Sequence, residues 1–131
     1  MSRFHEVAPA VPASVGQLRN AVAGYARDAG ASDDLVRSMQ LAVSEAMSNA
    51  VVHAYVDSPA PGTLSVTAFV QDGGFCVVVS DDGAGMRPRP DSPGLGVGLP
   101  LMTQMSESLE FRVNDAGGTE VAMRFALTKA A

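Results

Sequence analysis

The stretch from Leu41 to Val56, LAVSEAMSNAVVHAYV, constrains the fold more than any other part of the chain. Apolar residues occupy most of its helical circumference, which predicts a helix buried inside a domain. Glu45, Asn49 and His53 interrupt it at every fourth position. Residues four apart on a helix differ by only about 40° around its axis, so these side chains form one polar stripe. Because an unpaired buried carboxylate or amide is costly, the stripe must have partners or line a cleft.

Two interpretations of the stripe stay open from the helix alone. In the first, backbone groups satisfy Glu45 and Asn49, and His53 is an ordinary core histidine. In the second, the stripe faces a cation or a reacting hydroxyl group. Glutamate can act as a general base, and an asparagine carbonyl oxygen suits Mg²⁺. The chain has only 2 histidines, without the spacing of zinc ligands, which argues against a histidine-based metal site.

Length and composition predict one domain, residues 1–131, because 47% apolar and 18% charged residues suffice for a core of its own. No apolar run is long enough for a transmembrane helix, and the N-terminus lacks a signal-peptide pattern. The net charge of −5 argues against direct binding to nucleic acid or an anionic membrane. Cys76 is the single cysteine and lies in an apolar run, so we expect a buried, unreactive thiol and a cytoplasmic protein.

Two long helices are predicted in the first half of the chain. The first covers residues 14–30, where Ser14 and Gln17 have capping-box spacing and Gly30 ends the helix. The second runs from near Ser32 to about Tyr55 and contains the polar stripe. The break DSPAPG follows it.

Strands are predicted where apolar residues alternate on either side of glycine-containing turns. Four segments qualify: residues 63–71, 75–80, 108–114 and 119–127. A short helix is expected between the two hairpins, at residues 99–106. This order of elements predicts an α+β fold, a two-layer sandwich with the helices packed on one face of a mostly antiparallel mixed sheet.

Acidic and glycine residues follow the predicted strand that ends at residue 80. In VVVSDDGAGM, Asp81, Gly83 and Gly85 come directly after buried positions. Such a segment can be a simple turn. Alternatively, the Asp81 carboxylate can accept a hydrogen bond from an amine in a pocket, and the glycines allow a flat ligand to approach the backbone closely.

A second glycine segment, PGLGVGLPLM, places Gly94, Gly96 and Gly98 before the predicted short helix. Free N–H groups at such a position can bind an anion. The segment lacks the Gly-Lys-Ser/Thr ending of a Walker A loop and the preceding parallel strand of a dinucleotide fingerprint. The turn GGT at 117–119 suggests one more close approach of the backbone.

Together, Glu-x3-Asn-x3-His-Ala-Tyr, Asp-x-Gly-x-Gly, Gly-Leu-Gly-x-Gly and Gly-Thr resemble the motifs of the Bergerat (GHKL) ATP-binding fold. More narrowly, the pattern is similar to the anti-sigma-factor serine kinases, or switch kinases, over nearly the whole chain, from about Pro12 to Leu127. The resemblance implies a cytoplasmic kinase that uses ATP and Mg²⁺, phosphorylates an anti-sigma antagonist of the STAS type and sequesters a sigma factor. Related kinases are often dimers, so a homodimer is also an expectation.

The resemblance also implies a role for each matched residue. Glu45 would be the general base, and Asn49 would bind Mg²⁺ that bridges the phosphates. Asp81 would accept a hydrogen bond from the adenine amino group, with Gly85 beneath the ring and Thr119 helping through water. Three glycines would hold the phosphates: Gly94, Gly96 and Gly98. Two further residues match the family in position, His53 as support for the site or the helix and Arg19 as a contact for partner proteins.

One segment departs from the family pattern. Only RPRPDSP, residues 87–93, separates Met86 from Gly94, whereas the family has a longer lid and typically an arginine close before those glycines. Phosphoryl transfer requires positive charge at the γ-phosphate, and prolines stiffen a segment in which Arg87 or Arg89 would have to supply it. Three alternatives therefore stay open: a non-catalytic ATP-binding module that switches partners, a stand-alone histidine-kinase-like ATPase domain, and a structural domain without nucleotide.

Overall fold

The computed structural model describes residues 2–53, 62–82, 106–113 and 118–127. These residues form two helices and five strands. In chain order they are β1 (Phe4–Pro9), α1 (Pro12–Asp28), α2 (Asp33–His53), β2 (Thr63–Gln71), β3 (Gly74–Asp81), β4 (Ser108–Val113) and β5 (Thr119–Ala126). The short helix expected at residues 99–106 falls almost entirely outside the described residues.

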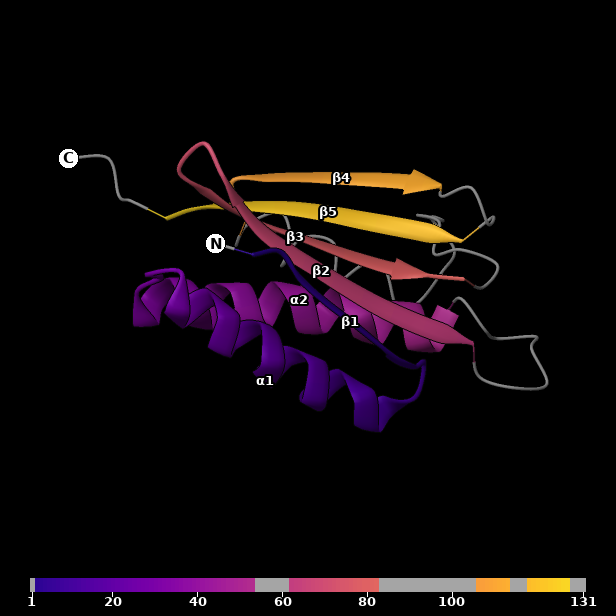
Figure 1. Ribbon diagram of the computed structural model, residues 1–131. Coiled ribbons are helices and arrows are strands. Elements are labelled where there is room, and N and C mark those ends of the chain that lie inside the picture. Colours follow the sequence, from indigo (N-terminus) through magenta and orange to yellow (C-terminus); the bar gives the residue numbers. More distant parts are fainter. Residues whose placement is uncertain (1, 54–61, 83–105, 114–117, 128–131) are drawn as a thin grey trace.

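The strands form one sheet in the order β1-β2-β3-β5-β4, and each pairing between these described strands is antiparallel. Both helices lie on the same face of the sheet (Figure 1). This arrangement confirms the predicted α+β two-layer sandwich. Within the described strands the sheet is purely antiparallel, so its predicted mixed character is not seen there.

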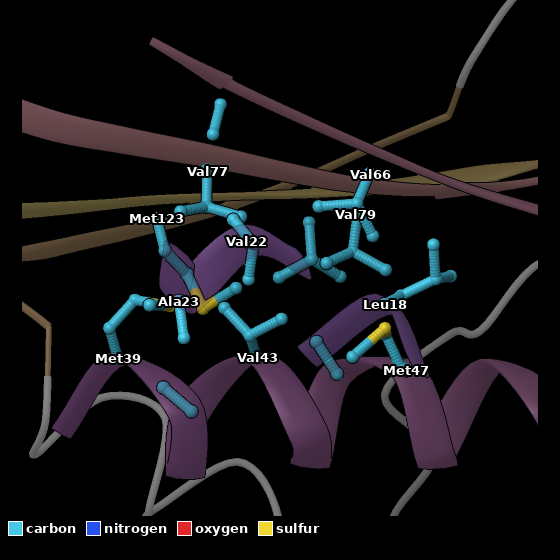
Figure 2. Packing of buried hydrophobic residues seen from close by; sticks show 14 of the residues in the cluster. Leu18, Val22, Ala23, Met39, Val43, Met47, Val66, Val77, Val79 and Met123 are labelled. Carbon is cyan, nitrogen blue, oxygen red and sulfur yellow. The ribbon is translucent and has the colours of Figure 1, made fainter. Parts of the chain in front are cut away.

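The core lies between the two layers, where side chains from both helices meet those of the sheet (Figure 2). Alternate residues of the three central strands point into it, as their period of two predicts. These buried strand residues include Leu64, Val66, Ala68, Phe75, Val77, Val79, Val121, Met123 and Phe125. The helices contribute Leu18, Val22, Met39, Val43 and Met47. Helix α2 therefore has a fixed orientation against the sheet.

The predicted start of α1 is wrong by two residues. The helix begins at Pro12 after Val11, with no side-chain cap, and Ser14 is buried within its first turn instead of capping it. Proline is favoured at a first helical position because the N–H that it lacks would have no helical partner there. Gly30, with φ of 94°, ends this region in a left-handed conformation, as predicted.

Helix α2 begins as predicted and has the expected dipole chemistry. The Leu35 backbone N–H donates to Ser32 Oγ at 3.2 Å, and Asp33 and Asp34 occupy the first turn. The helix is described to His53, so its expected end at Tyr55 lies outside the described residues. The prediction of a helix buried all round is wrong, because α2 is a surface helix whose outer face remains in water.

Strand β1 was not predicted from the sequence. It pairs with β2 in a register that runs from Phe4 opposite Ala68 to Pro9 opposite Thr63. Most of its side chains are exposed, because it is an edge strand. The Phe4 ring packs on Tyr25 of α1, with 5.6 Å between the ring centroids. An edge strand with little buried surface gives no alternating pattern to recognise.

The sheet face opposite the helices carries Cys76, which is half-buried there, so the expectation of a core thiol is wrong. Its Sγ lies 3.7 Å from Nη1 of Arg124. A cavity of about 350 Å³ opens on the same face, lined mainly by residues of β3, β4 and β5. Neither described helix combines the length and the apolar character needed to cross a bilayer.

Candidate functional site

Three elements of the predicted site end or begin at the same end of the sandwich. The C-terminal end of α2, the C-terminal end of β3 and the start of β5 all lie there (Figure 1). Because β3 and β5 are antiparallel, with Ser80 opposite Glu120, the end of one strand meets the start of the other. The fold thus places Asp81 beside Thr119, two site residues that are far apart in the sequence.

Asp81 is a buried carboxylate held by the backbone. Its side chain is enclosed, with 5% of the residue exposed, and Thr119 is 4% exposed. The Thr119 N–H donates to Asp81 Oδ1 at 3.4 Å. The next residue, Asp82, is exposed and makes a different contact. Its Oδ1 accepts a hydrogen bond from the Thr63 N–H at 2.8 Å. The two neighbours of β3, strands β2 and β5, are therefore each hydrogen-bonded at this end of the sheet to one residue of the Asp81–Asp82 pair.

Gly118 is packed against the backbone of the same pair. A Cβ atom added to Gly118 would collide with the carbonyl oxygen of Asp81 and approach Cα of Asp82 to 3.0 Å. The sequence indicated a close approach at Gly-Gly-Thr without identifying what approaches. The structure shows that the neighbour is the protein's own Asp81 backbone, a role for Gly118 that sequence reasoning missed.

Replacing Gly118 with alanine is expected to lower the free energy of unfolding by about 2 kcal/mol, because backbone atoms cannot move aside for a new methyl group. Urea unfolding would measure the loss. The matched control is Gly24→Ala, because a Cβ at Gly24 meets nothing within 4 Å. That helical change is expected to stabilise the chain by up to about 1 kcal/mol. Equal stability of the Gly118 variant and the parent would contradict the tight packing.

Asn49 lies on the sheet side of the polar stripe. It is 6% exposed, and its Nδ2 is buried without a hydrogen-bond partner in the described part of the chain. A buried donor left unpaired costs about 1–3 kcal/mol, so native proteins rarely keep one without a use. Within the described part of the chain no backbone group accepts from the Asn49 Nδ2, so the first interpretation of the stripe finds no support there for this donor. Because its Nδ2 makes no hydrogen bond to the described residues, the Asn49 side chain can direct its carbonyl oxygen to a cation and its N–H to a phosphate.

Glu45 lies one helical turn before Asn49 and is partly exposed. Around the helix axis, Asn49 is about 40° from Glu45 toward the buried face, and Leu41 is about 40° from it toward solvent. Glu45 is therefore at the rim of the site, where a carboxylate can exchange a proton with a bound molecule. Among the residues that the structure describes, no group of three or more His, Cys, Asp or Glu side chains is placed to hold a metal ion.

Of the remaining predicted residues, His53 and Arg19 lie in the described part of the chain. Outside the described residues lie the glycines Gly83, Gly85, Gly94, Gly96 and Gly98, together with Arg87 and Arg89. His53 is the last residue of α2. Arg19 is partly buried on α1. The structure therefore brings together Asp81 with Thr119, and Glu45 with Asn49, on neighbouring elements.

These features place the chain in a known class. Residues 8–125 match the histidine kinase-like ATPase domain, and the chain belongs to that family. It is 28% identical to the anti-sigma F factor of Clostridium acetobutylicum over 117 residues, which cover 81% of this chain and 80% of the relative. It is 32% identical to the serine-protein kinase RsbW of Bacillus subtilis (strain 168) over 130 residues, which cover 88% of this chain and 79% of the relative. Within the family, the chain belongs to the anti-sigma-factor serine kinase branch of the GHKL superfamily.

Solved structures show the same fold. The crystal structure of the RsbU and RsbW domains of a Mycobacterium tuberculosis protein matches all of this chain with a TM-score of 0.77 at 22% identity, and the match spans 34% of that chain. The histidine kinase domain of a blue-light activated kinase from Erythrobacter litoralis matches 86% of this chain with a TM-score of 0.61 at 22% identity. At such identities the likeness establishes the fold alone.

Proposed function

We propose that the chain is a Mg²⁺-dependent, ATP-dependent protein serine/threonine kinase that phosphorylates an anti-sigma antagonist protein and sequesters a sigma factor. The observation that carries this proposal is the buried Asn49 Nδ2, which has no hydrogen-bond partner in the described part of the chain and lies one helical turn from the partly exposed Glu45. This combination supports a ligand site on α2. The similarity to an anti-sigma F factor and to RsbW kinases supports the choice of partners.

Asp81 would select adenine. A buried carboxylate accepts hydrogen bonds only, and the exocyclic amino group of adenine donates them. The bond from the Thr119 N–H fixes the carboxylate in place, and the two oxygens together offer about four acceptor positions. Gly83 and Gly85, which follow in the sequence, would leave room for the base. Gly94, Gly96 and Gly98 would supply backbone N–H groups to the phosphates.

Asn49 would contribute its carbonyl oxygen to Mg²⁺, which neutralises phosphate charge during transfer. The residues present fit this ion, since it needs only one or two protein oxygens besides phosphate and water. Glu45 would accept the proton of the serine or threonine hydroxyl as the hydroxyl oxygen attacks the γ-phosphorus of ATP. The bond between that phosphorus and the β,γ-bridging oxygen would break, and ADP would leave. Its place at the rim lets it contact a hydroxyl that arrives from solvent, and a general base must reach its proton directly or through one water.

A second function, an ATP-binding regulator that switches partners without transferring phosphate, is favoured by one observation. Only seven residues separate Met86 from Gly94, and neither of the two residues directly before Gly94, Ser92 and Pro93, is an arginine. Positive charge at the γ-phosphate is needed for transfer but not for binding.

Calorimetric titration with ATP, with and without Mg²⁺, followed by a phosphate-transfer assay with candidate antagonist proteins separates the two functions. We expect magnesium-dependent binding and transfer to a serine or threonine of one antagonist. Binding without transfer to any candidate would support the non-catalytic regulator. Absence of both heat and thermal stabilisation at millimolar ATP would overturn both functions.

A further inference from the structure

Two large apolar side chains are exposed on the outer face of α2. Leu41 is 51% exposed and Val52 is 58% exposed. Relative to Glu45 they lie about 40° and about 20° around the helix axis, both on the solvent side. Asn49 lies on the other side of Glu45, toward the sheet. The Glu45 carboxylate therefore separates the buried side of the site from an exposed apolar strip formed by Leu41 and Val52.

Within the described part of the chain, Glu45 is open to an acceptor hydroxyl on its solvent side. The flank toward the sheet is closed by side chains of α2 that are themselves buried, namely Ala42, Ala46 and Ala50. A general base must lie about 3 Å from the oxygen whose proton it takes. A protein that delivers its hydroxyl to Glu45 from solvent must therefore cover the helix surface on which Leu41 and Val52 lie.

The charges on α2 indicate the chemistry of that protein segment. Besides Glu45 and the terminal His53, the charged residues of this helix are confined to its first two turns. There, Arg37 is paired with Asp34 at 3.0 Å. Glu45 is the only charged residue of α2 between Leu41 and Val52, so the two apolar side chains are the main features available for recognition along this strip.

We propose that Leu41 and Val52 determine acceptor specificity by binding apolar side chains on both sides of the phosphorylated hydroxyl. With a rise of about 1.5 Å per residue, Leu41 lies about 6 Å before Glu45 and Val52 about 10 Å after it. The acceptor is thus a segment that lies along α2 and carries one apolar side chain about 6 Å from the hydroxyl on one side and another about 10 Å from it on the other. This inference rests on the proposed kinase function.

Serine substitutions at the two positions test the proposal, with transfer measured to the antagonist that the wild-type chain phosphorylates. Leu41→Ser and Val52→Ser are each expected to raise KM for that protein about tenfold, because each removes one apolar contact. The affinity for ATP and the melting temperature are expected to stay unchanged, since both side chains are already exposed. Val7→Ser is the matched control, because Val7 is also 58% exposed but lies on edge strand β1.

Replacement of the two apolar residues of the acceptor by serine supplies the reciprocal test. Loss on both sides of a contact should be less than additive, as a double-mutant cycle measures. If the α2 variants transfer phosphate with the wild-type KM, or weaken ATP binding instead, the specificity proposal is overturned while the kinase function stands. If the wild-type chain phosphorylates none of the candidate antagonists, the kinase function and the specificity proposal are both overturned.

Discussion

Asp81→Asn is expected to reduce ATP affinity by about a hundredfold or more. The amide keeps the shape of the carboxylate but presents an N–H donor where the adenine amino group also donates. A site built around a specific hydrogen bond discriminates strongly when that bond cannot form. Calorimetry with the variant at millimolar ATP measures the loss, and urea unfolding shows whether the fold survives the change.

Asp82→Asn is the matched control for this prediction. It makes the same chemical change one residue later, at an exposed side chain whose bond from the Thr63 N–H an amide oxygen can still accept. We expect wild-type ATP affinity in this variant. If Asp81→Asn also bound ATP with wild-type affinity, the proposal that Asp81 binds adenine would be contradicted.

Glu45→Ala is expected to keep ATP affinity near that of the wild type and to slow phosphate transfer to the antagonist by about 10²–10⁴-fold, the usual contribution of a general base. The side chain lies at the rim of the proposed site and is partly exposed, so its loss is expected to leave the proposed nucleotide contacts of Asn49 and Asp81 in place. Single-turnover transfer with preloaded ATP isolates the chemical step from binding.

Glu110→Ala removes an equal charge from an exposed position of β4, outside the proposed site, and serves as the control. It should transfer phosphate at the wild-type rate. Transfer by Glu45→Ala at that same rate would exclude Glu45 as the base, and the hydroxyl would then have to lose its proton elsewhere.

Much of the fold follows from local patterns in the sequence. Alternating apolar residues predicted β2, β3, β4 and β5, and the buried sets on the central strands match that prediction. Ser32 and Gly30 mark helix boundaries because their capping and left-handed conformations are properties of single residues and their near neighbours. The sequence also predicted the polar stripe, because a period of 3.6 residues places Glu45 and Asn49 on one side of any helix.

Parts of the site were beyond such patterns. The sequence marked Asp81 and Thr119 through a family resemblance, and only the pairing of β3 with β5 shows the N–H of one bonded to the carboxylate of the other. The requirement for glycine at position 118 comes from the backbone of Asp81, a segment nearly forty positions earlier. The roles of the glycines between residues 83 and 98 stay predictions.

The sequence by itself determined the class of fold, the position of α2 and the residue types that a nucleotide site needs, since all three depend on local periodicity and short motifs. Tertiary structure alone decided that β1 joins the sheet, that Cys76 faces away from the core, and that Leu41 and Val52 face solvent. The reason is physical. An apolar side chain has the same local preference on either face of a helix or strand, and only the packing of distant segments determines which face is covered.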